Sequence, residues 1–247
     1  MTTPNAKLAG LALIAALCVG FPLGLTAPAW AGFDEGLAAL KRDDYATALR
    51  EFRPLAEQGN AKAQNSLGDM YFATVGVPYD LAEAVKWYRK AAEQGHAEAQ
   101  NSLGFMYKYG QGVPQDYAKA VKWYRKAAEQ GQVQAQLTLA NWSYRCGGEV
   151  PDPFCRFTSP VDAVYTEAAK WYRLAAEQGN AVSQRSLGIM YTEGQGVPQD
   201  YVMAHKWLNL AAAQGGTTRD TAVKVRDAVA AKMTPAQISE AQRLARE

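Results

Sequence analysis

The sequence is poor in the side chains from which most active sites are built. Its 247 residues include only two histidines, His96 and His205, and three cysteines, so a zinc site would lack ligands at a regular spacing. The sequence contains no H-E-x-x-H, G-x-S-x-G, Walker or Ser-x-x-Lys motif. We therefore expect no catalytic residue, no metal and no cofactor, and we interpret both histidines as structural.

The sequence also lacks an excess of charge of one sign. Lys and Arg number 26 and Asp and Glu number 24, which gives a net charge of +2. The two signs interleave along the chain instead of forming the basic stripe that nucleic-acid binding requires. We therefore expect no nucleic-acid partner.

What the sequence does contain is a repeated stretch, Trp87–Gly95, which reads WYRKAAEQG. It recurs at Trp123–Gly131, at Trp171–Gly179 and, more loosely, at Trp207–Gly215, and a shorter echo ends at Gly59. The closing glycines are 36 residues apart, except for one interval of 48 residues that includes an insertion. Self-similarity of this period is typical of a solenoid, in which each unit buries its apolar face against its neighbours.

Each unit is predicted to form two helices. In the first unit, Asn60 is placed to cap the first helix and Asp80 the second. Gly68 stands in the middle of the first helix, although glycine there costs about 1 kcal/mol relative to alanine. We therefore expect an aromatic side chain of the second helix to approach Gly68 closely.

Two further predictions concern the turns near the start of the array. Asp43 is predicted to cap the second helix of an N-terminal hairpin. Thr74 stands where later units have Gly110 and Gly194, which predicts a different turn in the first loop.

The segment from Ala99 to Gly131 reads A-Q-x-x-L-G-x-x-Y-x-x-G-x-G-V-P-x-D-x-x-K-A-x-x-W-Y-x-K-A-A-E-Q-G. This pattern resembles the Sel-one-like repeat, a relative of the tetratricopeptide repeat. The resemblance implies an all-α fold, a right-handed α/α superhelical solenoid of helix pairs, whose members act as interaction scaffolds. In bacteria such proteins are often exported and assist signalling, envelope assembly or host contact. We divide the chain into a signal peptide (1–31), an N-terminal helical hairpin (32–59), four repeats (60–95, 96–131, 132–179 with the insertion, and 180–215) and C-terminal capping helices (216–247).

The N-terminus has the features of an export signal. Lys7 precedes the apolar run Leu8–Phe21, and Ala29-Trp30-Ala31 places small residues where signal peptidase reads. We predict cleavage after Ala31 and a periplasmic or secreted protein without a membrane span once the signal is removed. The alternative is that the segment is retained as an N-terminal anchor, because its length approaches the ~20 residues that span a bilayer.

Cysteine usage agrees with export. If Cys18 leaves with the signal, Cys146 and Cys155 remain, and both lie in the inserted segment. In an oxidising compartment they would close a short loop, stabilising the fold by roughly 2–3 kcal/mol. We predict a disulfide between them.

The predicted binding surface is a stripe on the first helix of each unit. Its positions vary between units whereas the core positions barely change, as expected if the fold sets one group and a partner the other. By resemblance to tetratricopeptide arrays, this stripe lines a concave groove that binds a protein or peptide. The groove residues are Lys62, Asn65, Asp69, Phe72, Glu98, Asn101, Phe105, Lys108, Gln134, Leu137, Asn141, Tyr144, Arg185 and Ile189. The alternatives are that these positions are merely solvated, or that the cysteine loop makes the contact.

An enzymatic function is the alternative to a binding scaffold. A cysteine-rich branch of the resembled family has been linked to β-lactam binding or hydrolysis. This sequence lacks that branch's cysteine pair in every repeat and lacks a Ser-x-x-Lys pair. We therefore favour the scaffold and expect no enzyme activity.

Overall fold

The computed structural model describes residues 29–147, 155 and 161–247. Within these residues the chain forms twelve α-helices and no strand. The signal segment lies outside the described residues up to position 28. The helices are α1 (Ala29–Lys41), α2 (Tyr45–Glu57), α3 (Ala61–Ala73), α4 (Leu81–Glu93), α5 (Ala97–Tyr109), α6 (Tyr117–Glu129), α7 (Val133–Cys146), α8 (Val161–Glu177), α9 (Ala181–Glu193), α10 (Tyr201–Ala213), α11 (Thr217–Ala230) and α12 (Pro235–Leu244).

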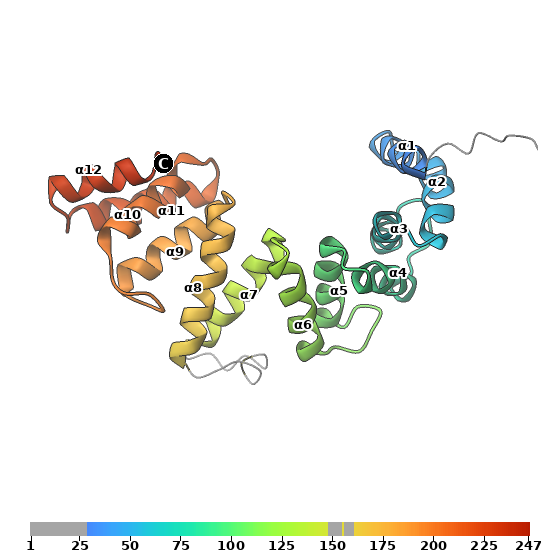
Figure 1. Cartoon of the computed structure of the whole chain (residues 1–247), viewed down its shortest axis with the longest axis horizontal. Helices are drawn as coiled ribbons and strands as arrows, with labels where there is room; N and C mark the ends of the chain where they lie inside the picture. The colour runs from blue at the N-terminus through green and yellow to red at the C-terminus, as the bar shows by residue number, and fades with distance from the viewer. Residues whose placement is uncertain (1–28, 148–154, 156–160) are drawn as a thin grey trace, which may run out of the picture.

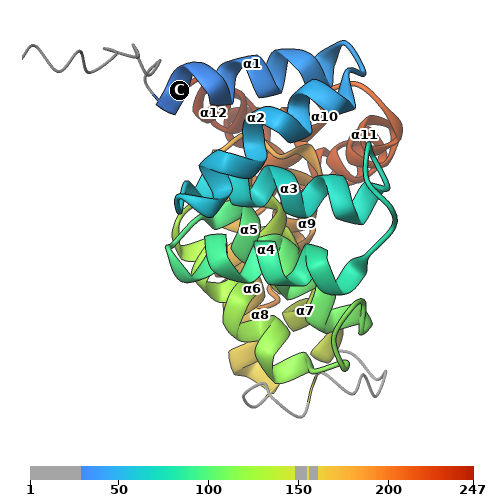
Figure 2. The same cartoon turned by 90° about the vertical axis from the view of Figure 1, so that its right-hand side faces the viewer.

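The helices form a curved solenoid. From α1 to α10 each helix packs mainly on the helices before and after it in the chain, and α11 and α12 both pack on α10. Figure 1 shows the array bending from α1 at one end to α12 at the other. In Figure 2 the first four helices lie stacked in layers. The prediction of an all-α superhelical solenoid is confirmed.

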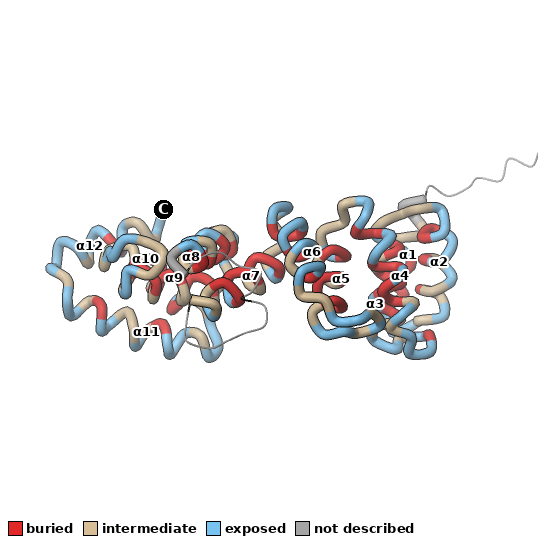
Figure 3. The backbone as a smooth tube through the Cα atoms, turned by 90° about the horizontal axis from the view of Figure 1, so that it is seen from below, coloured by how far each residue is buried: buried red, intermediate tan, exposed pale blue. Residues whose placement is uncertain are grey.

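Apolar side chains fill the space between neighbouring helices. The buried stretches of α3, α4 and α5 face one another inside the array (Figure 3). One apolar cluster extends from Ala84 to Val229, and a second at the N-terminal end joins Ala39 to Trp87. Burial within each unit and between adjacent units therefore holds the solenoid together.

Side-chain caps fix where the helices begin. The Asn60 side chain accepts from the Ala63 N–H, and the Asp80 side chain accepts from the Glu83 N–H, so both predicted caps are confirmed. His96 likewise accepts from the Ala99 N–H through Nδ1 at 3.3 Å, which gives this histidine a structural role.

The two predictions about the early turns are wrong. Asp44, not Asp43, caps α2, because Asp43 has the left-handed φ of +57° that closes the tight turn after α1. Thr74 adopts the same left-handed cap as Gly110, with φ of +60° against +66°, and its N–H likewise bonds a carbonyl one turn back in the helix. The first loop therefore begins with the same turn, at a strain cost of about 1–2 kcal/mol for a residue with a Cβ.

Four buried glutamines link adjacent helices. Each donates from Nε2 to a carbonyl near the end of the preceding helix, and each accepts from a glutamine just after the following helix. In the second unit, Gln100 donates to the Ala92 carbonyl at 3.1 Å and accepts from Gln130 at 2.7 Å. The members are Gln64, Gln100, Gln136 and Gln184.

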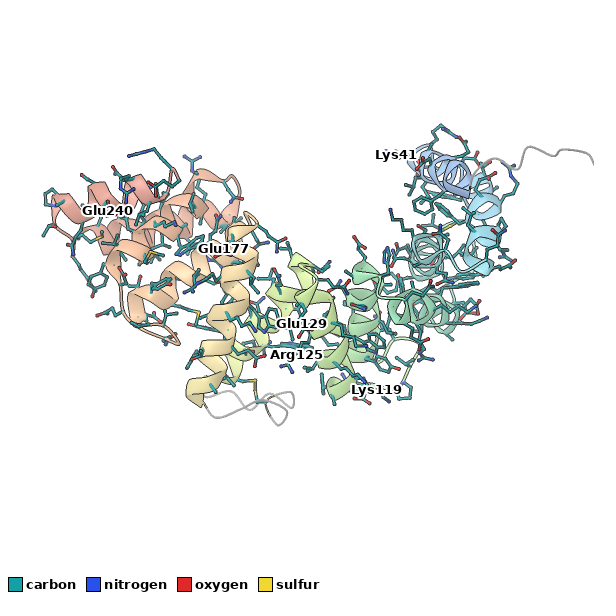
Figure 4. The ribbon with its side chains drawn as sticks, in the orientation of Figure 1. Lys41, Lys119, Arg125, Glu129, Glu177 and Glu240 are labelled. Atoms are coloured by element: carbon teal, nitrogen blue, oxygen red, sulfur yellow. A yellow bond between two sulfur atoms is a disulfide. The ribbon has the colours of Figure 1, made fainter. Side chains whose placement is uncertain are left out.

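A second link between units changes at the insertion. Arg89 of α4 and Arg173 of α8 each donate to a tyrosine hydroxyl of the following helix. In the third unit the corresponding residue is Ser143, whose side chain is too short. Arg125, labelled in Figure 4, donates instead to Glu167 of α8 at 2.8 Å.

Candidate functional site

The fourteen predicted groove residues lie on α3, α5, α7 and α9, the first helices of the four units. Lys62, Asp69, Glu98, Gln134 and Asn141 are exposed, and the other nine are half-buried. A surface of this kind leaves side chains accessible while neighbouring helices restrict their rotamers, which lowers the entropy lost on binding.

Two adjoining pockets open on this surface. The first, which we call the aromatic pocket, has a volume of about 220 Å³ and lies between α3 and α5. The rings of Phe72 and Phe105 meet edge to face in its wall, with centroids 5.9 Å apart. Its lining residues are Asp69, Phe72, Tyr88, Asn101, Ser102, Phe105 and Met106.

Asp69 carries the only charge in the lining of the aromatic pocket. Its carboxylate accepts from the Tyr88 hydroxyl at 2.8 Å and from the Asn65 amide at 3.0 Å. The surrounding protein desolvates the carboxylate and raises its pKa to about 6, whereas the hydrogen bond from Tyr88 acts in the opposite direction. The residue as a whole remains exposed, so a ligand can reach it.

The second pocket, which we call the polar pocket, lies between α5 and α7 and has a volume of about 330 Å³. Lys108 and Arg145 are the charged residues of its lining. The Lys108 ammonium stands 4.4 Å from the ring centre of Trp142 and 4.9 Å from that of Tyr109. The lining residues are Asn101, Phe105, Lys108, Tyr109, Tyr124, Gln134, Thr138, Asn141, Trp142 and Arg145.

The structure brings half of the predicted groove residues together in these two pockets. Asn101 and Phe105 belong to both linings and so form their common wall. Of the other groove residues, Asp69 and Phe72 line the aromatic pocket. Lys108, Gln134 and Asn141 line the polar pocket. The remaining residues line neither pocket: Lys62, Asn65, Glu98, Leu137, Tyr144, Arg185 and Ile189. The Tyr144 ring packs on Tyr165 of α8 instead, with centroids 5.5 Å apart.

The sequence prediction missed the contribution of the second helices. Tyr88 of α4 and Tyr124 of α6 reach the pockets past the glycines of the first helices. A Cβ on Gly68 would lie 2.6 Å from the Tyr88 ring, and one on Gly104 would lie 3.1 Å from the Tyr124 ring. The predicted close approach of an aromatic residue to Gly68 is therefore confirmed. It was also the signal that could have placed both tyrosines at the groove.

The cysteine pair lies at the end of α7. Cys146 and Cys155 are joined by a disulfide, with their Cα atoms 5.3 Å apart. The rest of the inserted loop, positions 148–154 and 156–160, lies outside the described residues. The prediction that this loop is a contact element concerns these positions and so stays a prediction.

The two histidines form no site for chemistry. His205 is buried in α10 and its Nδ1 has no hydrogen-bond partner in the part of the chain that the structure describes. Burial lowers its pKa, and the charge of Arg226 acts in the same direction. Among the described residues, no three His, Cys, Asp or Glu side chains gather as a metal site would require. No helix among them combines the length and apolar character needed to cross a membrane.

Comparisons with known proteins place these features in context. The family model for the Sel1 repeat matches residues 61–96, 97–132, 155–180 and 181–216. A Sel1 repeat protein from Oxalobacter formigenes has a similar crystal structure, with 29% identity and a TM-score of 0.65 over 83% of this chain and 86% of that chain. A search of the curated proteins found no match.

Two other solved structures are similar at lower scores. The protective antigen c5321 of uropathogenic Escherichia coli, described as having an SLR fold, is 26% identical with a TM-score of 0.37, over 89% of this chain and 60% of that chain. The immunity protein Pa5087 of Pseudomonas aeruginosa is 18% identical with a TM-score of 0.48, over 86% of this chain and 81% of that chain. Both TM-scores are below 0.5, so nothing about this chain is concluded from either.

Proposed function

This chain belongs to the Sel1 repeat family, and from that premise we propose that it is an exported scaffold that binds a protein or peptide partner in its concave groove. At the family level, Sel1 repeats are scaffolds for protein–protein interaction and are generally non-catalytic. The observation that carries the proposal is the pair of adjoining pockets, which share Asn101 and Phe105. Two pockets side by side fit successive side chains of one bound segment.

The chemistry of the groove supports a peptide-like ligand. The aromatic pocket offers apolar surface, and the polar pocket offers amide and hydroxyl groups beside Lys108. Convergent polar groups around an apolar anchor site are typical of peptide recognition. Whether this scaffold has a regulatory or an assembly role in the bacterial envelope depends on which partner it binds.

The groove assignment predicts a loss of partner binding when its rings are removed. In Phe105→Ala with Tyr144→Ala, we expect site-specific photo-crosslinking from position 134 to lose the adduct that it forms in the otherwise unchanged protein. Gln134 is exposed in the lining of the polar pocket, so a crosslinker there reports on the groove without displacing the core. Both deleted rings are half-buried and pack on other rings, so we expect a cost of about 1–3 kcal/mol each. Circular dichroism should still show a folded helical protein.

The matched control is Tyr79, which is 61% exposed in the loop between α3 and α4. A crosslinker at position 79 should give no adduct, and Tyr79→Ala should leave the adduct from position 134 intact. Equal adducts from positions 79 and 134, or an adduct that survives the double substitution, would show that the groove is not the binding surface.

Export predicts both the mass and the oxidation state of the mature protein. We expect a chain that starts at or near Gly32, two mass units lighter than its reduced form because Cys146 and Cys155 are joined. Support comes from the apolar run with Ala29-Trp30-Ala31 behind it and from the bonded cysteine pair. Intact-mass measurement of the unreduced protein tests both points. The protein is expressed with its own N-terminal segment and without an added export signal. Retention of residues 1–31 would favour the anchor, and two thiols that react with a labelling reagent would contradict the disulfide.

A further inference from the structure

The fold requires a hydrogen-bond acceptor at the position of Asp69, but it does not require a charged carboxylate there. The equivalent residue in the third unit is Asn141, which accepts from the Tyr172 hydroxyl at 2.7 Å, just as Asp69 accepts from the Tyr88 hydroxyl at 2.8 Å. A neutral amide therefore makes the same helix-to-helix hydrogen bond. Since desolvating a negative charge is costly, the structural role alone does not account for a carboxylate here.

Nothing within the described chain neutralises this charge. No Lys or Arg among the described residues forms an ion pair with Asp69. The nearby Glu98 has the same sign and raises the pKa of Asp69 further, after the larger effect of desolvation. Asn101, in the opposite wall, has a buried Oδ1 without a hydrogen-bond partner, which adds to the negative potential in the pocket.

The walls around this charge suit a cation with an apolar stem. Phe72, Tyr88 and Phe105 line the pocket, and the Tyr88 hydroxyl contacts the carboxylate. Aromatic faces attract Lys and Arg head groups, and they also cover the methylene stem of either side chain. A carboxylate held by two hydrogen bonds needs little reorganisation to accept another donor.

We propose that the aromatic pocket is the site for a lysine or arginine side chain of the partner segment, with Asp69 as its counter-ion. This inference rests on the proposed function, because it specifies what the groove-bound segment carries. Charge complementarity decides the occupant, since an uncharged apolar side chain would leave the desolvated carboxylate unpaired. The neighbouring polar pocket is lined by Lys108, whose charge disfavours a second basic side chain there.

The test is a selection that requires no known partner. A phage-displayed library of random peptides is selected on the purified mature protein and, in parallel, on Asp69→Asn. We expect peptides from the unchanged protein to share one position occupied by Lys or Arg, and we expect Asp69→Asn to lose that preference. The Tyr172–Asn141 pair indicates that Asn at position 69 preserves the hydrogen bond to Tyr88. The matched control is Glu93→Gln, which removes an exposed charge at the end of α4 that lines neither pocket, and it should retain the preference.

The effect is then measured on synthetic peptides with acetylated N-termini, so that no terminal amine can supply the cation. Replacing the selected Lys or Arg by Gln should weaken binding to the unchanged protein by about tenfold or more, as expected for a desolvated charge pair. The same replacement should change binding to Asp69→Asn by less than about threefold. The comparison of the two peptides on the unchanged protein does not depend on how well the variant folds.

The possible failures are distinguishable. Selected peptides that bind without a basic position, or that discriminate Lys from Gln equally well on Asp69→Asn, would overturn the cation site while leaving groove binding intact. Failure of the unchanged protein to select any peptide would overturn the proposed function together with this inference.

Discussion

Gln136→Leu is expected to lower the free energy of unfolding by about 2 kcal/mol, although it replaces a polar side chain by an apolar one of similar size. Gln136 is 1% exposed. Its amide donates to the Ala128 carbonyl of α6 at 3.0 Å, and its oxygen accepts from Gln178, just after α8, at 2.9 Å. Leucine removes both bonds and leaves the Ala128 carbonyl and the Gln178 amide without this partner, which costs more than the gain in apolar burial.

The control lies two residues away on the same helix. Gln134 is exposed, and Gln134→Leu should change the free energy of unfolding by no more than about 0.5 kcal/mol. Both variants are compared by urea unfolding followed by circular dichroism. If the two substitutions have equal effects, the buried glutamines do not stabilise the contacts between units.

Features that depend on a local rule were predicted correctly from the sequence. The period of the closing glycines predicts the solenoid because it marks where each second helix must end, and Asn60 and Asp80 predict their helix starts because their side chains reach backbone N–H groups three residues on. The misplaced cap at Asp43 is a shift of one residue within the pair Asp43–Asp44. Either aspartate could cap α2, and only the backbone angles of the turn distinguish them.

Thr74 was misjudged because residue type was given more weight than context. Threonine disfavours a left-handed backbone, yet the turn after α3 also has to deliver the chain to the start of α4. The hydrogen bonds that close this turn, from Thr74 and Val75 to the Met70 carbonyl, match those of the second unit. The repeat geometry therefore outweighs a local strain of about 1–2 kcal/mol.

The two pockets could be predicted only in part. Helical spacing placed the fourteen positions on one stripe, because residues three, four and seven apart share a helix face. It could not say that Phe105 and Asn101 would separate two pockets, since that depends on how far apart α3, α5 and α7 lie. It also missed Tyr88 and Tyr124, which belong to other helices and reach the groove only because a glycine makes room for each ring.

That glycine contact leads to the other large expected effect. In Gly68→Ala the new Cβ would lie 2.6 Å from two carbons of the Tyr88 ring, well inside van der Waals contact. The ring cannot easily withdraw, because Tyr88 is 3% exposed and its hydroxyl is bonded to Asp69. Alanine improves helix propensity by about 1 kcal/mol, whereas overpacking of this kind costs about 1–3 kcal/mol and the displaced hydroxyl loses a bond worth about 1 kcal/mol. We therefore expect a net destabilisation of about 1–3 kcal/mol.

The same substitution in the next unit provides the comparison. At Gly104 the new Cβ would lie 3.1 Å from the Tyr124 ring, so a shift of a few tenths of an ångström would accommodate it. The third unit already carries Ala140 at this position, fully buried, opposite Tyr172. Gly104→Ala should therefore be close to neutral in urea unfolding, and Gly68→Ala clearly destabilising. Equal stability of the two variants would mean that α3 and α4 can move apart without loss. In that case the position of Tyr88, and with it the hydrogen bond that holds the Asp69 carboxylate in the aromatic pocket, would not depend on the glycine.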